Sequence, residues 1–231
     1  MRHAVDVARM QSANRLWSVG YPMLALVLGF FSVLVVSVGA ASPSEGNGGL
    51  GTVLFVVIAG SHFIGVTQLY SFCAGLSVTR RDYLAGTALV AVIQALVLGL
   101  GIVALAALEG ATGGWGAGVW SFRSTAVVNE NVAVQWIAGA APVLAYAACG
   151  ILVGVVHLRW GRIGLAVIGL GLGVLAAAAV AALVLLVTVA GPVGRSFTAP
   201  PVLVVHGLLP VVAALVVGGA GYLVLRRTAT P

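Results

Sequence analysis

Six long apolar runs dominate the sequence, and short polar or glycine-rich connections separate them. The runs cover residues 17–41, 52–76, 84–108, 132–156, 163–190 and 202–225. A helix needs about 20 apolar residues to cross the hydrocarbon core of a bilayer, and each run is long enough. Backbone groups left unpaired in lipid are costly, so each run should be helical. The pattern therefore predicts an all-α, polytopic membrane protein with six transmembrane helices.

Arginine is divided unequally between the two sides that these runs define. Nine arginines flank the side that carries both chain ends: Arg2, Arg9, Arg15, Arg80, Arg81, Arg159, Arg162, Arg226 and Arg227. Only Arg123 and Arg195 flank the other side. Basic residues collect in cytoplasmic loops, so both termini are predicted to be cytoplasmic. Residues 1–231 then form a single transmembrane domain, with a cytoplasmic N-terminal segment over 1–16 and a cytoplasmic tail over 226–231.

The composition supports lipid as the main solvent of this chain. Hydrophobic residues make up 61% of the sequence and charged residues only 7%, whereas soluble domains carry about 25% charged residues. The net charge of +6 comes from arginines placed between apolar runs, which favours membrane orientation over nucleic-acid binding. All 11 basic residues are arginine, and a phosphate-binding loop needs lysine. We therefore expect any ATP to be bound by another chain.

A few polar residues interrupt the second and third runs. Ser61, His62 and Gln68 lie in the second run, and Gln94 lies in the third at a depth that differs from Gln68 by about 3 Å. Polar groups cannot face lipid cheaply, so these residues should face protein. They either line a polar path through the membrane or serve helix packing, and His62 fits a structural role more simply than a proton relay.

No arrangement of residues predicts catalysis or metal binding. The chain contains no G-x-S-x-G or H-E-x-x-H motif, and its five acidic residues all lie in predicted tails or loops. The two cysteines lie inside apolar runs without metal-ligand spacing. We therefore expect the chain to be no enzyme, to have no catalytic residue, and to hold neither a metal nor a cofactor of its own.

The connection between the second and third runs carries the most distinctive motif, Gly-Leu-Ser-Val-Thr-Arg-Arg-Asp-Tyr from position 75 onward. Thr79 followed by Asp82 resembles a capping box, in which aspartate takes the place of the usual glutamate. A short helix can start here and expose Arg80 and Arg81 to the cytoplasm. The alternative is a simple positively charged anchor at the membrane surface.

This connection resembles the turn between the second and third spans of type-2 ATP-binding-cassette (ABC) transporter permeases. The C-terminal sequence from Gly221 to Arg227 resembles many bacterial members, and six spans with both ends inside is the family layout. The resemblance implies a short helix that couples the permease to an ATPase. That role would fall on six residues of the turn: Ser77, Thr79, Arg80, Arg81, Asp82 and Tyr83.

The resemblance also implies partners and a location. They are a cytoplasmic ATPase subunit that binds ATP and Mg, a second permease copy or a homologous permease, and the lipid of a bacterial cytoplasmic membrane. Two features depart from the family pattern. The connection over 191–201 is too short for much of a re-entrant element, and the long outer loop lies at 109–131 instead.

The expected function is that of the membrane subunit of an ATP-driven exporter for an amphipathic or hydrophobic substrate, such as a drug, an antibiotic or a lipid-like molecule. One alternative is a secondary transporter driven by an ion gradient, for which a membrane acid or an inverted repeat would be expected. The other alternative is a membrane assembly factor or sensor that transports nothing. A neighbouring gene that encodes an ATPase with a phosphate-binding loop would distinguish among these three functions.

Overall fold

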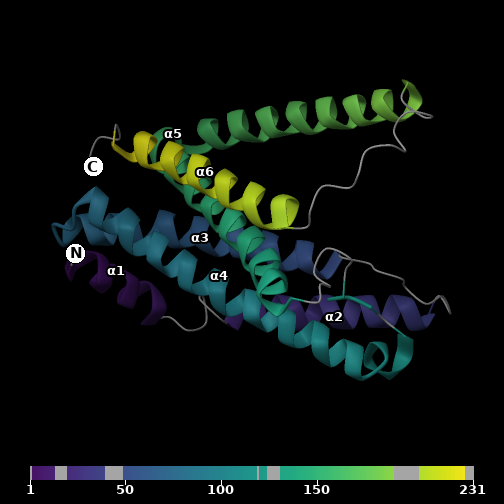
Figure 1. The fold of residues 1–231 in the computed structure, drawn as a ribbon. Coiled ribbons are helices and arrows are strands. Elements are labelled where there is room, and N and C mark those ends of the chain that lie inside the picture. Colours follow the sequence, from purple (N-terminus) through teal and green to yellow (C-terminus); the bar gives the residue numbers. More distant parts are fainter. Residues whose placement is uncertain are drawn as a thin grey trace.

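The computed structural model describes residues 2–13, 20–39, 49–118, 120–123, 131–189 and 203–226. Every regular element in these ranges is helical, which confirms the predicted all-α class (Figure 1). The elements in chain order are α1 (Arg2–Ala13), α2 (Tyr21–Gly39), α3 (Gly49–Gly75), α4 (Arg80–Ala111), η2 (Gly114–Gly118), α5 (Val132–Val189), η4 (Leu203–Leu208) and α6 (Leu209–Arg226). The predicted tail beyond Arg226, the 191–201 connection and loop residues 124–130 lie outside the described ranges.

Four of the described helical segments are long and apolar enough to cross a membrane. They are Val53–Gly75, Arg80–Ala111, Val132–Gly171 and His206–Arg226. Helix α2 and the far part of α5 also fall on predicted apolar runs. The structure thus supports a helical membrane protein with four candidate spans, while the count of six spans and the orientation in the membrane remain predictions.

Helix α5 bends back on itself at one glycine. Gly161 has φ 60° and ψ −143°, a conformation that glycine adopts at little steric cost. The two arms, 132–160 and 162–189, diverge from this point in Figure 1. The bend falls in the short connection that the sequence predicts between the fourth and fifth apolar runs.

The first arm of α5 lies at the centre of the bundle and packs against α3, α4 and α6. Glycines make this close packing possible. A Cβ atom at Gly154 would lie 2.9 Å from the Val66 Cβ atom of α3, and one at Gly150 would collide with the Ala59 carbonyl. Gly150 and Gly154, four residues apart on one face of α5, therefore allow α3 and α5 to approach closely.

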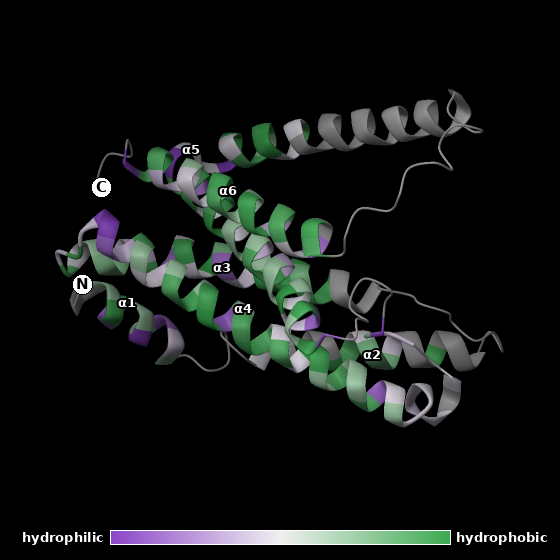
Figure 2. Cartoon of the chain, in the orientation of Figure 1, coloured by the Kyte–Doolittle hydropathy of each residue, from purple (hydrophilic) through white to green (hydrophobic). Residues whose placement is uncertain are grey.

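Many large apolar side chains of the described helices are exposed. Figure 2 shows hydrophobic residues along most of each long helix, with hydrophilic residues gathered mainly near the ends of the bundle. Large side chains that are exposed include Val97 and Leu100 of α4 and Leu215 of α6. This pattern suits a surface that contacts lipid or other membrane helices. The start of α1, the α3–α4 turn, the α5 bend and the end of α6 all lie at one end, which we call the arginine end (Figure 1).

Candidate functional site

The α3–α4 turn at the arginine end has the cap that its sequence predicts. The Thr79 hydroxyl accepts a hydrogen bond from the Asp82 backbone N–H at 3.1 Å and donates one to the Asp82 carboxylate at 2.8 Å. Ser77 has φ 60°, and this left-handed residue lets the chain reverse between the two helices. The capped helix is α4 itself, which corrects the expectation of a separate short helix at this place.

Arg80 points back into the protein. Its guanidinium donates to the carbonyls of Leu225 and Arg226 at 3.3 and 3.0 Å, at the end of α6. The last carbonyls of a helix have no partner within the helix, and the helix dipole favours a cation there. Arg80 therefore caps α6, a structural role that the resemblance to permeases did not predict.

Tyr83 is also occupied within the bundle. The side chain is only 1% exposed, and its hydroxyl donates to the Gly65 carbonyl of α3 at 3.3 Å. The expectation that Tyr83 lies on the ATPase-docking surface is thus revised, because its ring packs between helices. Ser77, Thr79 and Arg81 are exposed, and Asp82 is partly buried.

A second arginine meets the same helix end. Arg159, near the α5 bend, donates to the Val224 carbonyl at 3.3 Å, and its guanidinium lies 4.5 Å from the centre of the Trp160 ring. We call Arg80, Arg159 and the carbonyls of residues 224–226 the arginine cluster. It connects the α3–α4 turn, the α5 bend and the end of α6. The sequence predicted that these two arginines lie on the same side. It gave no sign that both donate to the carbonyls at the end of α6.

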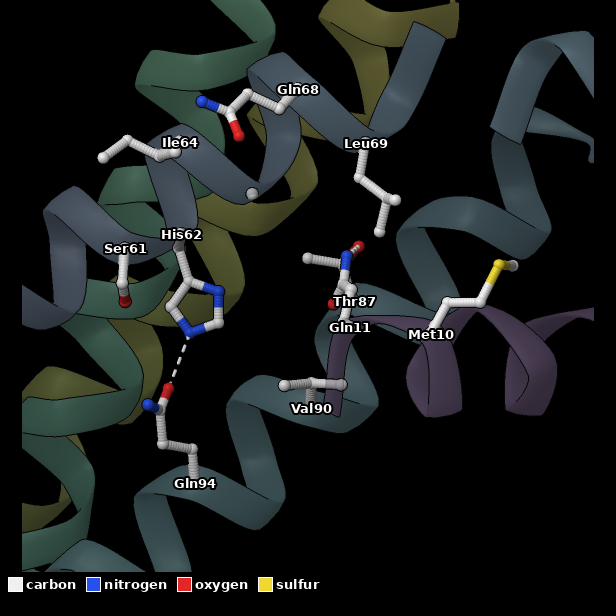
Figure 3. Close-up of a pocket in the computed structure, with 11 residues that line it drawn as sticks. Met10, Gln11, Ser61, His62, Ile64, Gln68, Leu69, Thr87, Val90 and Gln94 are labelled. Carbon is white, nitrogen blue, oxygen red and sulfur yellow. Dashed lines mark hydrogen bonds between the residues drawn. The ribbon is translucent and has the colours of Figure 1, made fainter. Parts of the chain in front are cut away.

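A cavity of about 210 Å³ lies between α1, α3 and α4, and we call it the helix cavity (Figure 3). Its lining residues are Met10, Gln11, Ser61, His62, Ile64, Gly65, Gln68, Leu69, Thr87, Val90 and Gln94. All four residues predicted to form a polar path or a packing contact are among them. The structure therefore brings Ser61, His62, Gln68 and Gln94 to one place.

Within the cavity wall, Gln94 pairs with His62. The His62 Nε2 and the Gln94 side-chain oxygen are 2.9 Å apart, and the amide oxygen accepts (Figure 3). His62 is only 6% exposed, so this bond satisfies a buried polar group inside an apolar bundle. Gln68 lines the same cavity but is exposed, and Ser61 donates to the Ile58 carbonyl at 2.8 Å.

Helix α1 forms one wall of the cavity and was not expected there. The Gln11 amide donates to the Thr87 hydroxyl of α4 at 2.8 Å, and Thr87 donates to the Tyr83 carbonyl at 3.0 Å. A Cβ atom at Gly86 would lie 2.8 Å from the Val7 Cβ atom, so this glycine lets α1 pack against α4. In the sequence, a glycine at position 86 next to the polar Thr87 was the sign that another helix could pack against α4 there.

The opposite end of α4 holds a buried carboxylate. Glu109 is 0% exposed, although it lies near the C-terminus of α4, where the helix dipole disfavours an anion. Its carboxylate accepts from the Trp115 indole at 2.9 Å, from the Phe122 amide at 3.0 Å and from the Arg123 amide at 2.7 Å. The Ser121 amide donates to it as well. We call this arrangement the carboxylate site.

The carboxylate site orders the loop that follows α4. Trp115 packs edge-on against Phe30 of α2, with ring centres 4.9 Å apart, and against Phe122 at 6.3 Å. The sequence indicated Glu109 only as one of five acidic residues in predicted tails or loops, whereas the structure places it within α4. The indole that donates to Glu109 lies six residues away along the chain and the loop amides twelve to fourteen, so neither periodicity nor a motif marks them.

Comparisons with known proteins do not assign the chain to a family. No family model, no curated protein and no solved structure matches it. Among the described residues, no group of three His, Cys, Asp or Glu side chains is placed to hold a metal ion.

Proposed function

We propose that the chain is the membrane-spanning permease subunit of an ATP-driven ABC exporter. Four helices with apolar outer faces supply a membrane body, and the helix cavity supplies polar groups inside it. A separate subunit would bind ATP and Mg, since the sequence has no lysine for a phosphate-binding loop. The substrate would be amphipathic or hydrophobic, in keeping with the apolar surroundings of the cavity.

The arginine cluster is the observation that carries this proposal. A partner that pushes on the α3–α4 turn would act on α4 directly and on α6 through Arg80. Arg159 connects the α5 bend to the same helix end. Force applied at one turn would thus reach α4, α6 and the bend of α5. Such a rigid connection is what an ATPase docking beneath a permease would need.

Arg81 is the residue best placed to touch that partner. It is exposed at the start of α4, next to Arg80, whose guanidinium is used within the bundle. The guanidinium of Arg81 presents a planar set of donors that matches a carboxylate on a docking surface. Asp82, fixed by the Thr79 cap, holds the backbone at this point.

The ion-driven alternative has less support from the described residues. Such a transporter would use an acid that takes up and releases ions during transport. The buried acid of α4, Glu109, is held by several N–H donors at the end of the helix. That arrangement suits a fixed structural anion.

Purification of the tagged chain from its native membrane tests the proposal. An ATPase with a phosphate-binding loop should remain bound, and the complex reconstituted in vesicles should hydrolyse ATP and move substrate. Arg81→Ala should lower ATP-driven transport about ten-fold while the chain still inserts, because a buried interfacial charge pair is lost. Arg162→Ala, at another exposed arginine of the same end, is the matched control. A complex without ATPase activity, or an Arg81→Ala variant that transports at the normal rate, contradicts the proposal.

A further inference from the structure

The wall of the helix cavity combines polar and apolar side chains but no charged ones. Its polar residues come from three helices: Gln11, Ser61, His62, Gln68, Thr87 and Gln94. Met10, Ile64, Leu69 and Val90 supply the apolar part. A binding site for a small molecule has this form, with a largely apolar wall and a few convergent polar groups.

We propose that the helix cavity binds a small uncharged molecule that carries an apolar ring or short chain and at least one hydrogen-bond donor. The proposal rests on the transport function for its biological meaning, since the bound molecule would be the substrate. Binding itself needs no ATPase and can be measured on the chain alone.

The volume limits the size of this molecule. The helix cavity measures about 210 Å³ and is partly open, with Gln68 exposed in its wall. An apolar cavity of about 150 Å³ is large enough for benzene. The helix cavity can therefore hold one or two fused aromatic rings, or a short aliphatic chain with a polar head.

His62 indicates why the ligand should carry a donor. Its Nε2 atom is bonded to the side-chain oxygen of Gln94, so Nε2 carries a proton, and we take the buried ring to be neutral. The other ring nitrogen, Nδ1, is then an acceptor. It lies on the side of the ring toward Thr87 and Gln11, across the cavity (Figure 3). A ligand N–H or O–H placed there would bond to Nδ1.

The same wall disfavours charged ligands. An ion brought from water into the cavity would lose part of its hydration, and none of the lining residues is an acid, a lysine or an arginine that would compensate. The hydrogen bonds of amides and hydroxyls repay only part of that loss. The cavity should therefore distinguish a neutral molecule from an ionised analogue of similar shape.

Protection of an introduced cysteine tests the proposal on the full chain in lipid nanodiscs. Val90→Cys places a thiol in the cavity wall, and Ile93→Cys places one on the same helix where the side chain is 52% exposed. Each variant is treated with N-ethylmaleimide, and mass spectrometry follows the modification of the introduced cysteine. Three probes are added in turn: indole, its isostere indene without the N–H donor, and an indole carboxylate.

Indole should slow labelling at Val90→Cys and leave labelling at Ile93→Cys unchanged. Indene should need a roughly five-fold higher concentration for the same protection, since it lacks one hydrogen bond. The indole carboxylate should give no protection. His62→Leu should remove the preference for indole over indene, and the unchanged labelling rate at Ile93→Cys in that background would show that the helix keeps its place.

Two results would overturn the proposal. One is equal protection by the carboxylate and by indole, and the other is equal protection of both cysteines, which would reflect partition into lipid. If His62→Leu changes the labelling of Ile93→Cys, Gln94→Leu is used as the test variant in its place. Gln94→Leu must then reduce the preference for indole over indene. If indole does not protect the cavity cysteine, the proposal of ATP-driven transport still stands. If Arg81→Ala has no effect on ATP-driven transport, indole can still bind in the helix cavity, so the two proposals can fail separately.

Discussion

The two ends of the bundle satisfy backbone groups with opposite charges. At the arginine end, Arg80 and Arg159 donate to the last carbonyls of α6. At the other end, the carboxylate of Glu109 accepts from an indole and from loop amides. Helix ends leave carbonyls that need donors, whereas a tight loop leaves amides that need acceptors, so the sign of each charge follows from the backbone group.

The charged side chains at the two ends also differ in how deeply they are buried. Glu109 is 0% exposed, while Arg80 and Arg159 are only partly buried. Hydrogen bonds to a buried charge weigh more than those at a wet surface, and their donors become costly when the charge is removed. The carboxylate site should therefore dominate stability, and the arginine cluster should matter more for transmitting motion between helices.

The largest expected effect follows from Glu109→Gln. The amide keeps one acceptor but places an NH₂ group against loop donors, so at least one buried amide loses its partner. We expect a loss of about 3 kcal/mol in the free energy of unfolding. Titration with a denaturing detergent, followed by tryptophan fluorescence, would measure it. Asp6→Asn, at an exposed acid of α1, should change little. Equal stability of the two variants would mean that the carboxylate does not hold the loop.

Arg80→Ala should have a smaller effect on stability. The variant leaves two carbonyls of α6 without their cation and should cost about 1 kcal/mol. The same unfolding titration applies, with Arg81→Ala as the control because Arg81 is exposed. A loss as large for Arg81 as for Arg80 would contradict the capping role. Among these variants, only Arg81→Ala is expected to lower transport without lowering stability.

Arg159→Ala should have the smallest effect, roughly 0.5 kcal/mol. It loses a single 3.3 Å bond to the Val224 carbonyl and the contact with the exposed ring of Trp160. Arg162→Ala provides the comparison on the other side of the Gly161 bend. A loss for Arg159→Ala that exceeds the loss for Glu109→Gln would reverse the proposed ranking of the two ends.

Local signals in the sequence were sufficient for several features. The apolar runs predicted where helices lie, because backbone groups in lipid must bond within a helix. The Thr79–Asp82 spacing predicted a helix start, since that cap involves only neighbouring residues. The four polar residues of the second and third apolar runs were predicted to avoid lipid, which stays a prediction; the structure gathers all four around the helix cavity, where Gln68 is exposed.

Partners far apart along the chain could not be predicted in this way. The sequence placed Gln94 at nearly the same depth as Gln68, but the structure pairs Gln94 with His62, 32 residues away. Arg80 reaches a carbonyl 146 residues away, and α1 covers the helix cavity. Such choices depend on the rotation and depth of each helix relative to its neighbours.

The sequence by itself determined that the chain is helical and apolar enough for a membrane, where its long helices lie and the end at which many of its arginines gather. Composition and periodicity suffice for these features, because each helix responds to lipid on its own. Only the tertiary structure decided that Tyr83 is buried, that Arg80 caps α6 and that Glu109 holds a loop. In lipid, apolar burial distinguishes poorly between one helix face and another, so close packing and hydrogen bonds between helices select those partners.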